Sequence, residues 1–195
     1  MALTPVRETV GAVRDVFLKV FELYTGGFSI NTAGFNKGVK LPKGSLLKVD
    51  ESTRLAAPIK TAVLTATADQ GASSFAVEPG HHFKVSDHVG LAGGGSAHRV
   101  KETTSTLIRI DSAAGKNLGA TAGIGAVLYH AAGTADAGAA AMKDVPNGIL
   151  RYDTHIATGE FATVAVRGSV YKRRIQAHIA GHLADLKHIH FSESK

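Results

Sequence analysis

Glycine-containing turns recur along this chain and divide it into short segments of strand-forming residues, which limits the folds open to it. The 195 residues include 22 glycines but only 8 phenylalanines, 4 tyrosines and no tryptophan. Frequent turns between short apolar runs favour many short strands, because glycine and other turn residues interrupt long helices. The sequence therefore predicts a mainly β protein.

The composition also excludes several kinds of site. The chain has no cysteine, so disulfides, thiolate zinc sites and cysteine nucleophiles are ruled out. With 44% hydrophobic and 19% charged residues it can bury a core. It has no apolar run of about 18 residues and no basic segment followed by an apolar run at its start. We therefore expect no membrane partner and a protein that is made and used in solution.

Charge is concentrated toward the two ends of the chain, whose net charge is +6. Basic and acidic side chains number nine and five in residues 1–60, five and five in 61–131, and eight and six in 132–195. Only Lys172, Arg173 and Arg174 form a cluster. A nucleic-acid-binding surface typically shows a dense basic stripe interleaved with aromatic residues. We therefore expect no nucleic acid partner.

The first 34 residues predict an amphipathic arm. Thr4-Pro5 is typical of a helix start, and apolar residues follow at helical spacing. From Val16 on, β-forming residues are so frequent that a strand is an alternative to the helix. Large apolar residues are dense enough over 16–35 that an isolated monomer would expose some of them, so we expect this arm to dock on a partner.

The middle of the chain predicts strands almost throughout. Residues 35–60 read as strand, turn and strand. Residues 61–131 contain six segments of β-alternation, which predict a compact β-module. These segments are 61–68, 73–77, a hairpin made of 85–91 and 97–101 around Gly93-Gly94-Gly95, 106–111, and 126–129.

The last third predicts a return to the first unit. Residues 132–147 are rich in alanine and glycine and read as a linker or a short helix. Strands are expected over 145–153 and, most strongly, over 162–171. Ile175, Ile179, Leu183 and Leu186 mark one face of a helix between Lys172 and Lys187. A short terminal strand is expected at 189–191.

Two parts of the chain resemble the lambda-type head decoration proteins and related head-fibre proteins of tailed phages. One is the phrase Leu-Pro-Lys-Gly-Ser-Leu-Leu-Lys-Val-Asp at 41–50. The other combines Pro146-Asn147-Gly148-Ile149-Leu150 and Asp153 with the strand Ala-Val-Arg-Gly-Ser-Val-Tyr at 165–171. The similarity covers about 35–60 and 143–191, less than half of the chain.

This resemblance implies a small β-barrel or β-tulip-like core with one C-terminal helix, assembled as a homotrimer on the major capsid protein lattice. Such a subunit locks neighbouring capsid proteins against the pressure of packaged DNA. It implies a location on the capsid surface of the virion, after assembly in the host cytoplasm. The expected domains are an N-terminal arm (1–34), a decoration-type core (35–60 plus 132–195) and an inserted β-module (61–131).

The ten histidines raise the possibility of a metal site. His178 and His182 are four residues apart on the predicted helix, and Asp185 follows one turn later, which is a spacing that can hold zinc. The alternative is that these histidines line a surface or a subunit interface. The pattern is not His-Glu-x-x-His, since Ile179-Ala180 stands where a catalytic glutamate would be needed. We therefore predict no metal and no cofactor.

No pattern of catalytic residues is apparent. The carboxylates of Asp111, Asp136, Asp144 and Asp153 are scattered over predicted loops without an acid/base partner. Ser45 and Ser169 lack the turn of a nucleophile elbow, and the triple glycine is not followed by the residues of a phosphate loop. The chain is therefore predicted not to be an enzyme.

The expected function is a structural one, a capsid decoration or cement subunit. Contacts with the capsid or with sister subunits are expected from seven residues, Phe17, Phe21, Phe28, Phe35, Lys172, Arg173 and Arg174. The alternative is a head-fibre or receptor- or glycan-binding display protein with 61–131 as its binding head. A third possibility is an internal DNA-organising protein, whose affinity would fall steeply with salt.

Overall fold

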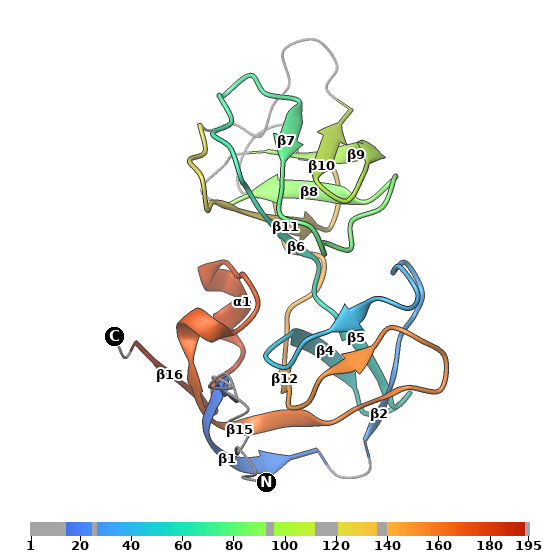
Figure 1. Ribbon diagram of the computed structural model, residues 1–195, viewed down its shortest axis with the longest axis vertical. Coiled ribbons are helices and arrows are strands. Elements are labelled where there is room, and N and C mark those ends of the chain that lie inside the picture. The colour runs from blue at the N-terminus through green and yellow to red at the C-terminus, as the bar shows by residue number, and fades with distance from the viewer. Residues whose placement is uncertain (1–14, 25–26, 93–95, 112–120, 136–139, 194–195) are drawn as a thin grey trace, which may run out of the picture.

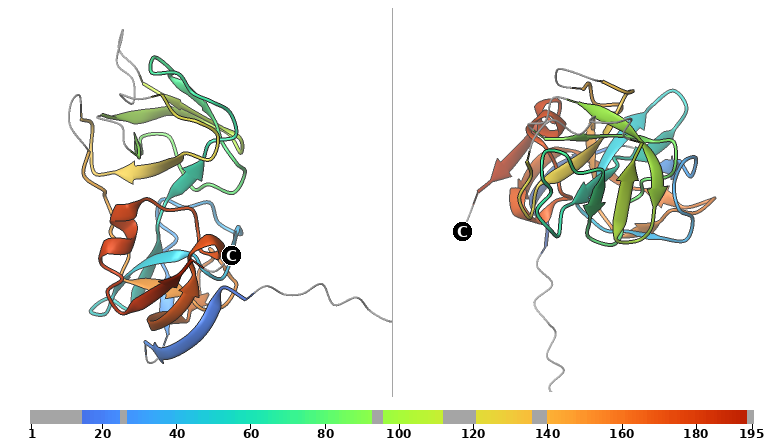
Figure 2. Two further views of the ribbon diagram at one scale, coloured as in Figure 1. Left: turned by 90° about the vertical axis from the view of Figure 1, so that its left-hand side faces the viewer. Right: turned by 90° about the horizontal axis from the view of Figure 1, so that it is seen from above.

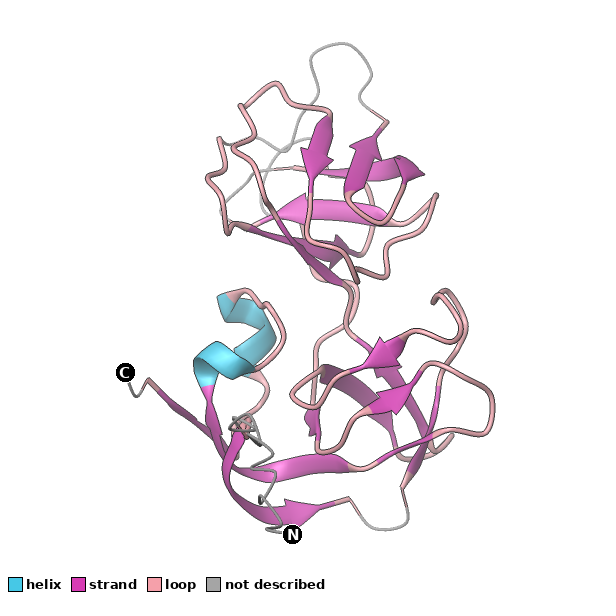
Figure 3. Ribbon diagram, viewed as in Figure 1, coloured by secondary structure: helices cyan, strands magenta, loops and turns pink. Residues whose placement is uncertain are grey.

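The computed structural model describes residues 15–24, 27–92, 96–111, 121–135 and 140–193. Within them the chain is mainly β, which confirms the predicted fold class, and its strands form two curled sheets arranged along the long axis of the molecule (Figures 1 and 2). Helix is confined to the C-terminal segment (Figure 3).

The first sheet contains eight strands in the order β1-β15-β12-β4-β5-β2-β14, with β16 also paired to β15. It curls into what we call the first barrel, because β14 and β15 are separated by one residue and so connect the two ends of the sheet. A two-stranded sheet of β3 and β13 lies outside this path. The bounds of these strands are β1 Phe17–Leu23, β2 Phe28–Ile30, β3 Lys40–Leu41, β4 Leu46–Asp50, β5 Leu55–Pro58, β12 Gly148–Leu150, β13 Thr154–His155, β14 Phe161–Ala162, β15 Val164–Tyr171 and β16 Ile189–Ser192.

The second sheet has the order β6-β11-β8-β9-β10-β7 and closes into what we call the second barrel. Closure comes from a bridge between Leu64 and Val77, and from the Thr65 N–H, which donates to the Ala76 carbonyl at 3.0 Å. All of its strands lie within 61–131. Their bounds are β6 Thr61–Val63, β7 Ser74–Ala76, β8 His88–Leu91, β9 Ala97–Thr103, β10 Leu107–Ile110 and β11 Val127–Ala131.

Each barrel has its own apolar core. The second barrel is filled by residues such as Phe75, Phe83 and Ile108, which are at most 2% exposed. The first barrel is filled around Phe28 and Leu150. A further cluster lies between β1, β15 and the C-terminal segment. The inward-facing residues alternate with exposed ones along β4 and β10, because successive side chains of a strand point to opposite faces.

Several predicted elements are confirmed. Strand β8 pairs with β9 as an antiparallel hairpin, and β16 follows the last predicted strand. Of the two alternatives for the N-terminal arm, a strand is present from Phe17 to Leu23, whereas the predicted helix start at Thr4-Pro5 and the triple glycine lie outside the described residues. The division into arm, core and inserted module stays a prediction about separate domains.

The described part of 132–147 forms backbone bonds to the end of β11 rather than a helix. Ala131 and Met142 form an isolated bridge, and the Ala132 N–H donates to the Ala141 carbonyl at 2.9 Å. The chain therefore returns toward the first barrel in an extended conformation.

The predicted helix over 172–187 is wrong. A 3₁₀ turn spans Lys172–Arg174, the following residues are extended, and the helix α1 covers only Ala180–Ala184. The physical reason is Gln176, whose side chain accepts a hydrogen bond from the Leu46 N–H at 3.0 Å and donates to the Ile59 carbonyl at 2.6 Å. These long-range bonds hold the segment before α1 against the barrel, where an extended chain also buries Ile175.

Strand β1 packs so closely on β15 that position 168 admits only glycine. A Cβ at Gly168 would meet the Lys19 carbonyl oxygen at 2.5 Å. We expect Gly168→Ala to push β1 away from β15 and to lower the free energy of unfolding by about 1–3 kcal/mol, as overpacking typically does. Denaturant unfolding measures the change. Gly71→Ala is the matched control, since a Cβ there meets nothing within 4 Å; equal effects of the two substitutions would contradict the prediction.

Candidate functional site

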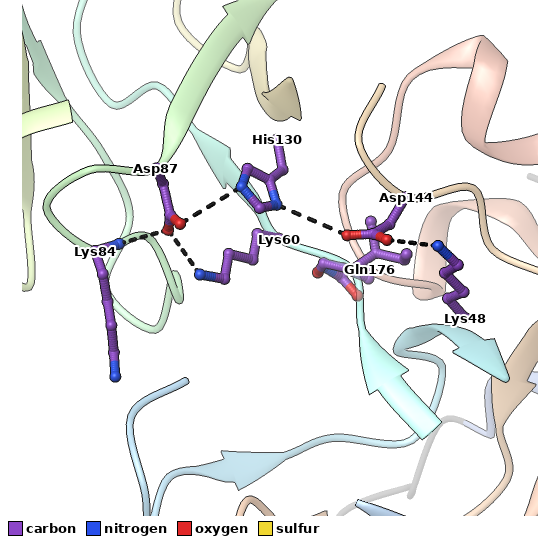
Figure 4. A network of polar contacts seen from close by, with 8 residues as sticks. Lys48, Lys60, Lys84, Asp87, His130, Asp144 and Gln176 are labelled. Atoms are coloured by element: carbon purple, nitrogen blue, oxygen red, sulfur yellow. Dashed lines mark hydrogen bonds and ion pairs between the residues drawn. The ribbon is translucent and has the colours of Figure 1, made fainter. Parts of the chain in front are cut away.

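A network of charged side chains lies where the two barrels meet, and we call it the junction network (Figure 4). Lys60 lies on the segment that crosses from β5 to β6, Asp87 directly precedes β8, and His130 is on β11. Asp144 belongs to the segment that returns to the first barrel, and Lys48 is on β4. The members of the network are Lys48, Lys60, Lys84, Asp87, His130 and Asp144.

Lys60 and Asp87 form the centre of the junction network. The Lys60 side chain is 4% exposed, and its Nζ donates to Asp87 Oδ2 at 2.6 Å. Burial lowers the pKa of Lys60, and Asp87 partly opposes that effect. Burial alone would raise the pKa of Asp87, but hydrogen bonds from His130, from Lys60 and from the Lys84 N–H outweigh it and hold this pKa far below its usual value. Both groups are therefore charged at neutral pH.

His130 links this pair to the first barrel. Its Nε2 lies 3.5 Å from Asp87 Oδ1 and its Nδ1 lies 3.9 Å from Asp144 Oδ2. Asp144 in turn accepts a hydrogen bond from Lys48 Nζ at 2.8 Å. Basic and acidic groups thus alternate from the second barrel to β4 of the first.

Other contacts fix the same junction. Lys84 Nζ donates to the Phe35 carbonyl at 2.7 Å, and the Phe35 ring meets the His82 ring edge-on at 5.7 Å between centroids. Lys60 Nζ lies 5.0 Å from the centre of the Phe35 ring. From the C-terminal segment, Gln176 Nε2 donates to Ile59 and to the Thr61 hydroxyl. The barrels are therefore held together by polar contacts from three segments.

A cleft of about 370 Å³ opens beside this junction, lined by residues of both barrels that include His81 and His82. His81 Nε2 donates to the Thr104 carbonyl at 2.8 Å, so its Nδ1 is an acceptor, and that atom is buried without a partner. Nδ1 of His82 is buried in the same way. Burial, with the nearby charge of Lys60, lowers the pKa of His82 to about 4, so this ring is neutral near pH 7.

The predicted metal ligands do not form the expected helical site. His178 precedes α1 in the extended segment, and its Nδ1 lies 2.9 Å from the Gln176 carbonyl oxygen. His182 is 1% exposed, and its Nδ1 accepts a hydrogen bond from the Ile179 N–H at 3.4 Å. Asp185 is the exposed C-cap of α1. Across the described ranges, no three histidine, aspartate or glutamate side chains lie close enough together to hold a metal ion.

The predicted contact residues separate into buried and exposed ones. Phe17, Phe28 and Phe35 are at most 7% exposed, so in this structure they belong to the cores instead of an outer contact surface. Phe21 is 58% exposed. The expectation that all four would be available failed because β1 and β2 are strands of the first barrel, each with one inward face.

The three basic residues that follow β15 lie at the surface. Lys172 Nζ pairs with Glu193 Oε1 at 2.6 Å. Arg174 donates to the Asp15 carbonyl at 2.7 Å and lies over the Tyr171 ring at 4.0 Å. The Arg173 side chain is exposed beside them. They precede a 3₁₀ turn and an extended segment, so the predicted clash with a helix dipole does not arise.

Strand β1 is a second candidate site, since it forms one edge of the first sheet. Leu18, Phe21 and Leu23 are 47%, 58% and 38% exposed along it. Lys19 Nζ lies 4.8 Å from the centre of the Phe21 ring, and the Arg167 guanidinium carbon lies 6.0 Å from it. An exposed aromatic ring between two cations is suited to contact with another macromolecule.

Comparison with known proteins gives no relative. No protein-family model matches the chain, and neither curated proteins nor solved structures include a detectable match. The described residues contain no helix that is long and apolar enough to span a membrane.

We expect Asp87→Ala to destabilise the protein strongly, because it leaves the Lys60 ammonium buried without a partner. Breaking a buried ion pair by removing one member typically costs about 3–5 kcal/mol. The double variant Lys60→Met, Asp87→Leu should cost less than the sum of the single changes. Urea unfolding of the four proteins measures this coupling. Asp69→Ala, at an exposed carboxylate, is the control, and strict additivity of the single effects would contradict the prediction.

The stability of the fold should decrease as the pH falls from about 6.5 to about 4. Burial lowers the pKa of both His82 and His182 from 6.5 to about 4, so the unfolded chain binds protons more readily than the folded one in this window. Each ring contributes up to about 3 kcal/mol that is fully present above pH 6.5. His182→Gln and His82→Gln should flatten the pH dependence of unfolding. His190→Gln, at an exposed ring, should leave it unchanged; a wild-type profile that is flat over this window would refute the prediction.

Proposed function

We propose that this chain is a structural subunit of a virus particle, a capsid decoration protein that binds the major capsid protein lattice as a homotrimer. In this proposal the first barrel is the part that binds the capsid. The second barrel projects away from the capsid surface. The proposal rests on how exposed apolar groups and charge are distributed between the barrels.

The observation that carries the proposal is an unequal distribution of exposed large apolar side chains. Six of the eight that are exposed in the described residues belong to the first-barrel part of the chain. They are Leu18, Phe21, Leu23, Leu55, Tyr152 and Phe161, whereas Val85 and Ile124 belong to the second. Exposed apolar groups on one part of a protein typically mark an interaction surface.

Charge follows the same division. Residues 61–131, which contain every strand of the second barrel, are neutral, and the rest of the chain carries the entire excess of six basic groups. An apolar surface with an excess of cations fits a partner with apolar and acidic groups. The second barrel lacks both features, which suits a projecting module.

The segments that resemble decoration proteins come together in the first barrel. Residues 41–50 include β4, residues 146–150 include β12, and residues 165–171 lie in β15. These three strands are neighbours in the sheet order β15-β12-β4 (Figure 1). Segments that are about 100 residues apart in sequence thus form one continuous surface, which supports their reading as one unit.

Phe161 provides a test of the proposed contact with the capsid. It is 66% exposed on β14 and lies in one row with Ser29 and the exposed Leu55 across β14, β2 and β5. Wild-type protein should bind saturably to head particles of its own virus that were assembled without it. Phe161→Lys should weaken this binding at least about tenfold, because it places a charge in the contact, which costs a kcal/mol or more. Co-sedimentation measures both.

The matched control is Ile124→Lys, which changes a residue that is 73% exposed on the second barrel. It should bind like the wild type. Absence of saturable binding by the wild type, or an equal loss in both variants, would overturn the proposed function.

A further inference from the structure

We propose that two copies of this chain pair with each other through strand β1, edge to edge and antiparallel. The inference rests on the proposed assembly role of the chain, but it concerns a contact between copies, not the contact with a capsid. It therefore identifies a second copy of the chain as the occupant of the β1 edge.

The first step is that β1 has a neighbour on one side. It pairs with β15, and within the described ranges no strand pairs with its other edge. Its seven residues, Phe-Leu-Lys-Val-Phe-Glu-Leu, are mostly strong strand formers without proline. An edge strand of this kind presents a row of backbone donors and acceptors to which another strand can add.

The second step is a β-bulge that places Phe21 outward. Val20 lies opposite Gly168 and Glu22 lies opposite Arg167, so Phe21 is an extra residue with no opposite partner on β15. Such a bulge redirects the side chain of the extra residue. Phe21 is accordingly 58% exposed, in the middle of the strand.

The third step is a consequence of the same bulge for the charges of β1. Lys19 lies opposite Ser169, and Glu22 lies opposite Arg167. Positions 167 and 169 of β15 are two residues apart and therefore point to the same face of the sheet. Lys19 and Glu22 consequently share one face, although they are three residues apart in sequence.

The charge order selects the occupant and its direction. If a second β1 lies antiparallel about a two-fold axis near the middle of the strand, Lys19 is level with the partner's Glu22, and Glu22 is level with the partner's Lys19. Unlike charges that are opposite each other on one face stabilise a strand pair, whereas like charges destabilise it. A parallel pair would instead place Lys19 beside the partner's Lys19. The exposed Leu18 and Leu23 also approach each other in the antiparallel arrangement.

The β1 edge is also held firmly enough to accept a partner. A Cβ at Gly168 would meet the Lys19 carbonyl oxygen at 2.5 Å, so β1 lies very close to β15. A two-fold contact joins copies in pairs and does not close a ring of three. In the proposed homotrimer this contact would therefore link one trimer to the next.

The inference is tested on the purified protein alone, without capsids, by sedimentation equilibrium over a range of concentrations. Phe21→Lys places a cation at the centre of the pair and should halve the mass of the wild-type assembly, whatever that assembly is. Ile124→Lys is the control and should keep the wild-type mass, because it lies on the second barrel. An unchanged mass for Phe21→Lys would overturn the inference.

A charge-swap pair separates a lost contact from a lost fold. Lys19→Glu places two carboxylates level with each other at each contact, and Glu22→Lys places two ammonium groups there. Each variant alone should show the halved mass with an unchanged circular dichroism spectrum. An equimolar mixture of the two should recover the full mass, because every contact then joins unlike charges. No recovery in the mixture would rule out the antiparallel arrangement and with it the inference.

Two further outcomes remain distinct. Removal of residues 1–14 should leave the mass unchanged; a mass halved by this deletion but not by Phe21→Lys would assign the contact to that segment and overturn the inference. If the masses behave as expected while the wild type fails to bind head particles, the pairing through β1 stands and the decoration function fails.

Discussion

The relative position of the two barrels depends on the buried ion pair between Lys60 and Asp87. A buried ammonium group is tolerated only where a carboxylate meets it at close range, because the cost of removing it from water must be offset there. The segment that crosses between the barrels carries Lys60, and the Phe35 ring of the first-barrel segment lies against its ammonium group. Rotation of one barrel against the other would disturb these contacts together. The pair therefore disfavours other orientations more than it adds to stability.

The sequence predicted most strands because their signal is local. Alternation of apolar and polar residues is visible within a few positions, and it correctly indicated the hairpin of β8 and β9 and the long strand β15. The same method was wrong for 172–187, where Ile175, Ile179 and Leu183 have helical spacing. The interaction that decides this segment is the bonding of Gln176 to Leu46 and Ile59, which are more than 110 residues away in sequence. No local pattern contains that information.

The candidate sites were predictable only in part, for a related reason. Phe21 was expected to be exposed and is, whereas Phe28 was expected to be available to a partner and is fully buried, because the strand pairing that encloses it is non-local. Lys60 and Asp87 carry no sequence signal, since nothing near either residue marks it as buried. The single hint was the position of Lys60 within the apolar run from Leu55 to Leu64. Chemistry that arises from burial is visible only once the fold is known.

The two connections to the second barrel leave it at adjacent points, because Thr61 of β6 is paired with Tyr129 of β11. Paired residues of antiparallel strands are about 5 Å apart between Cα atoms, so the path of the first barrel is interrupted by a gap that a very short peptide could span. The strand order of the first barrel is then insensitive to what is inserted at this point. A single genetic insertion or excision at these positions could exchange one outer module for another, which would let the outer surface diversify while the inner contacts stay constant.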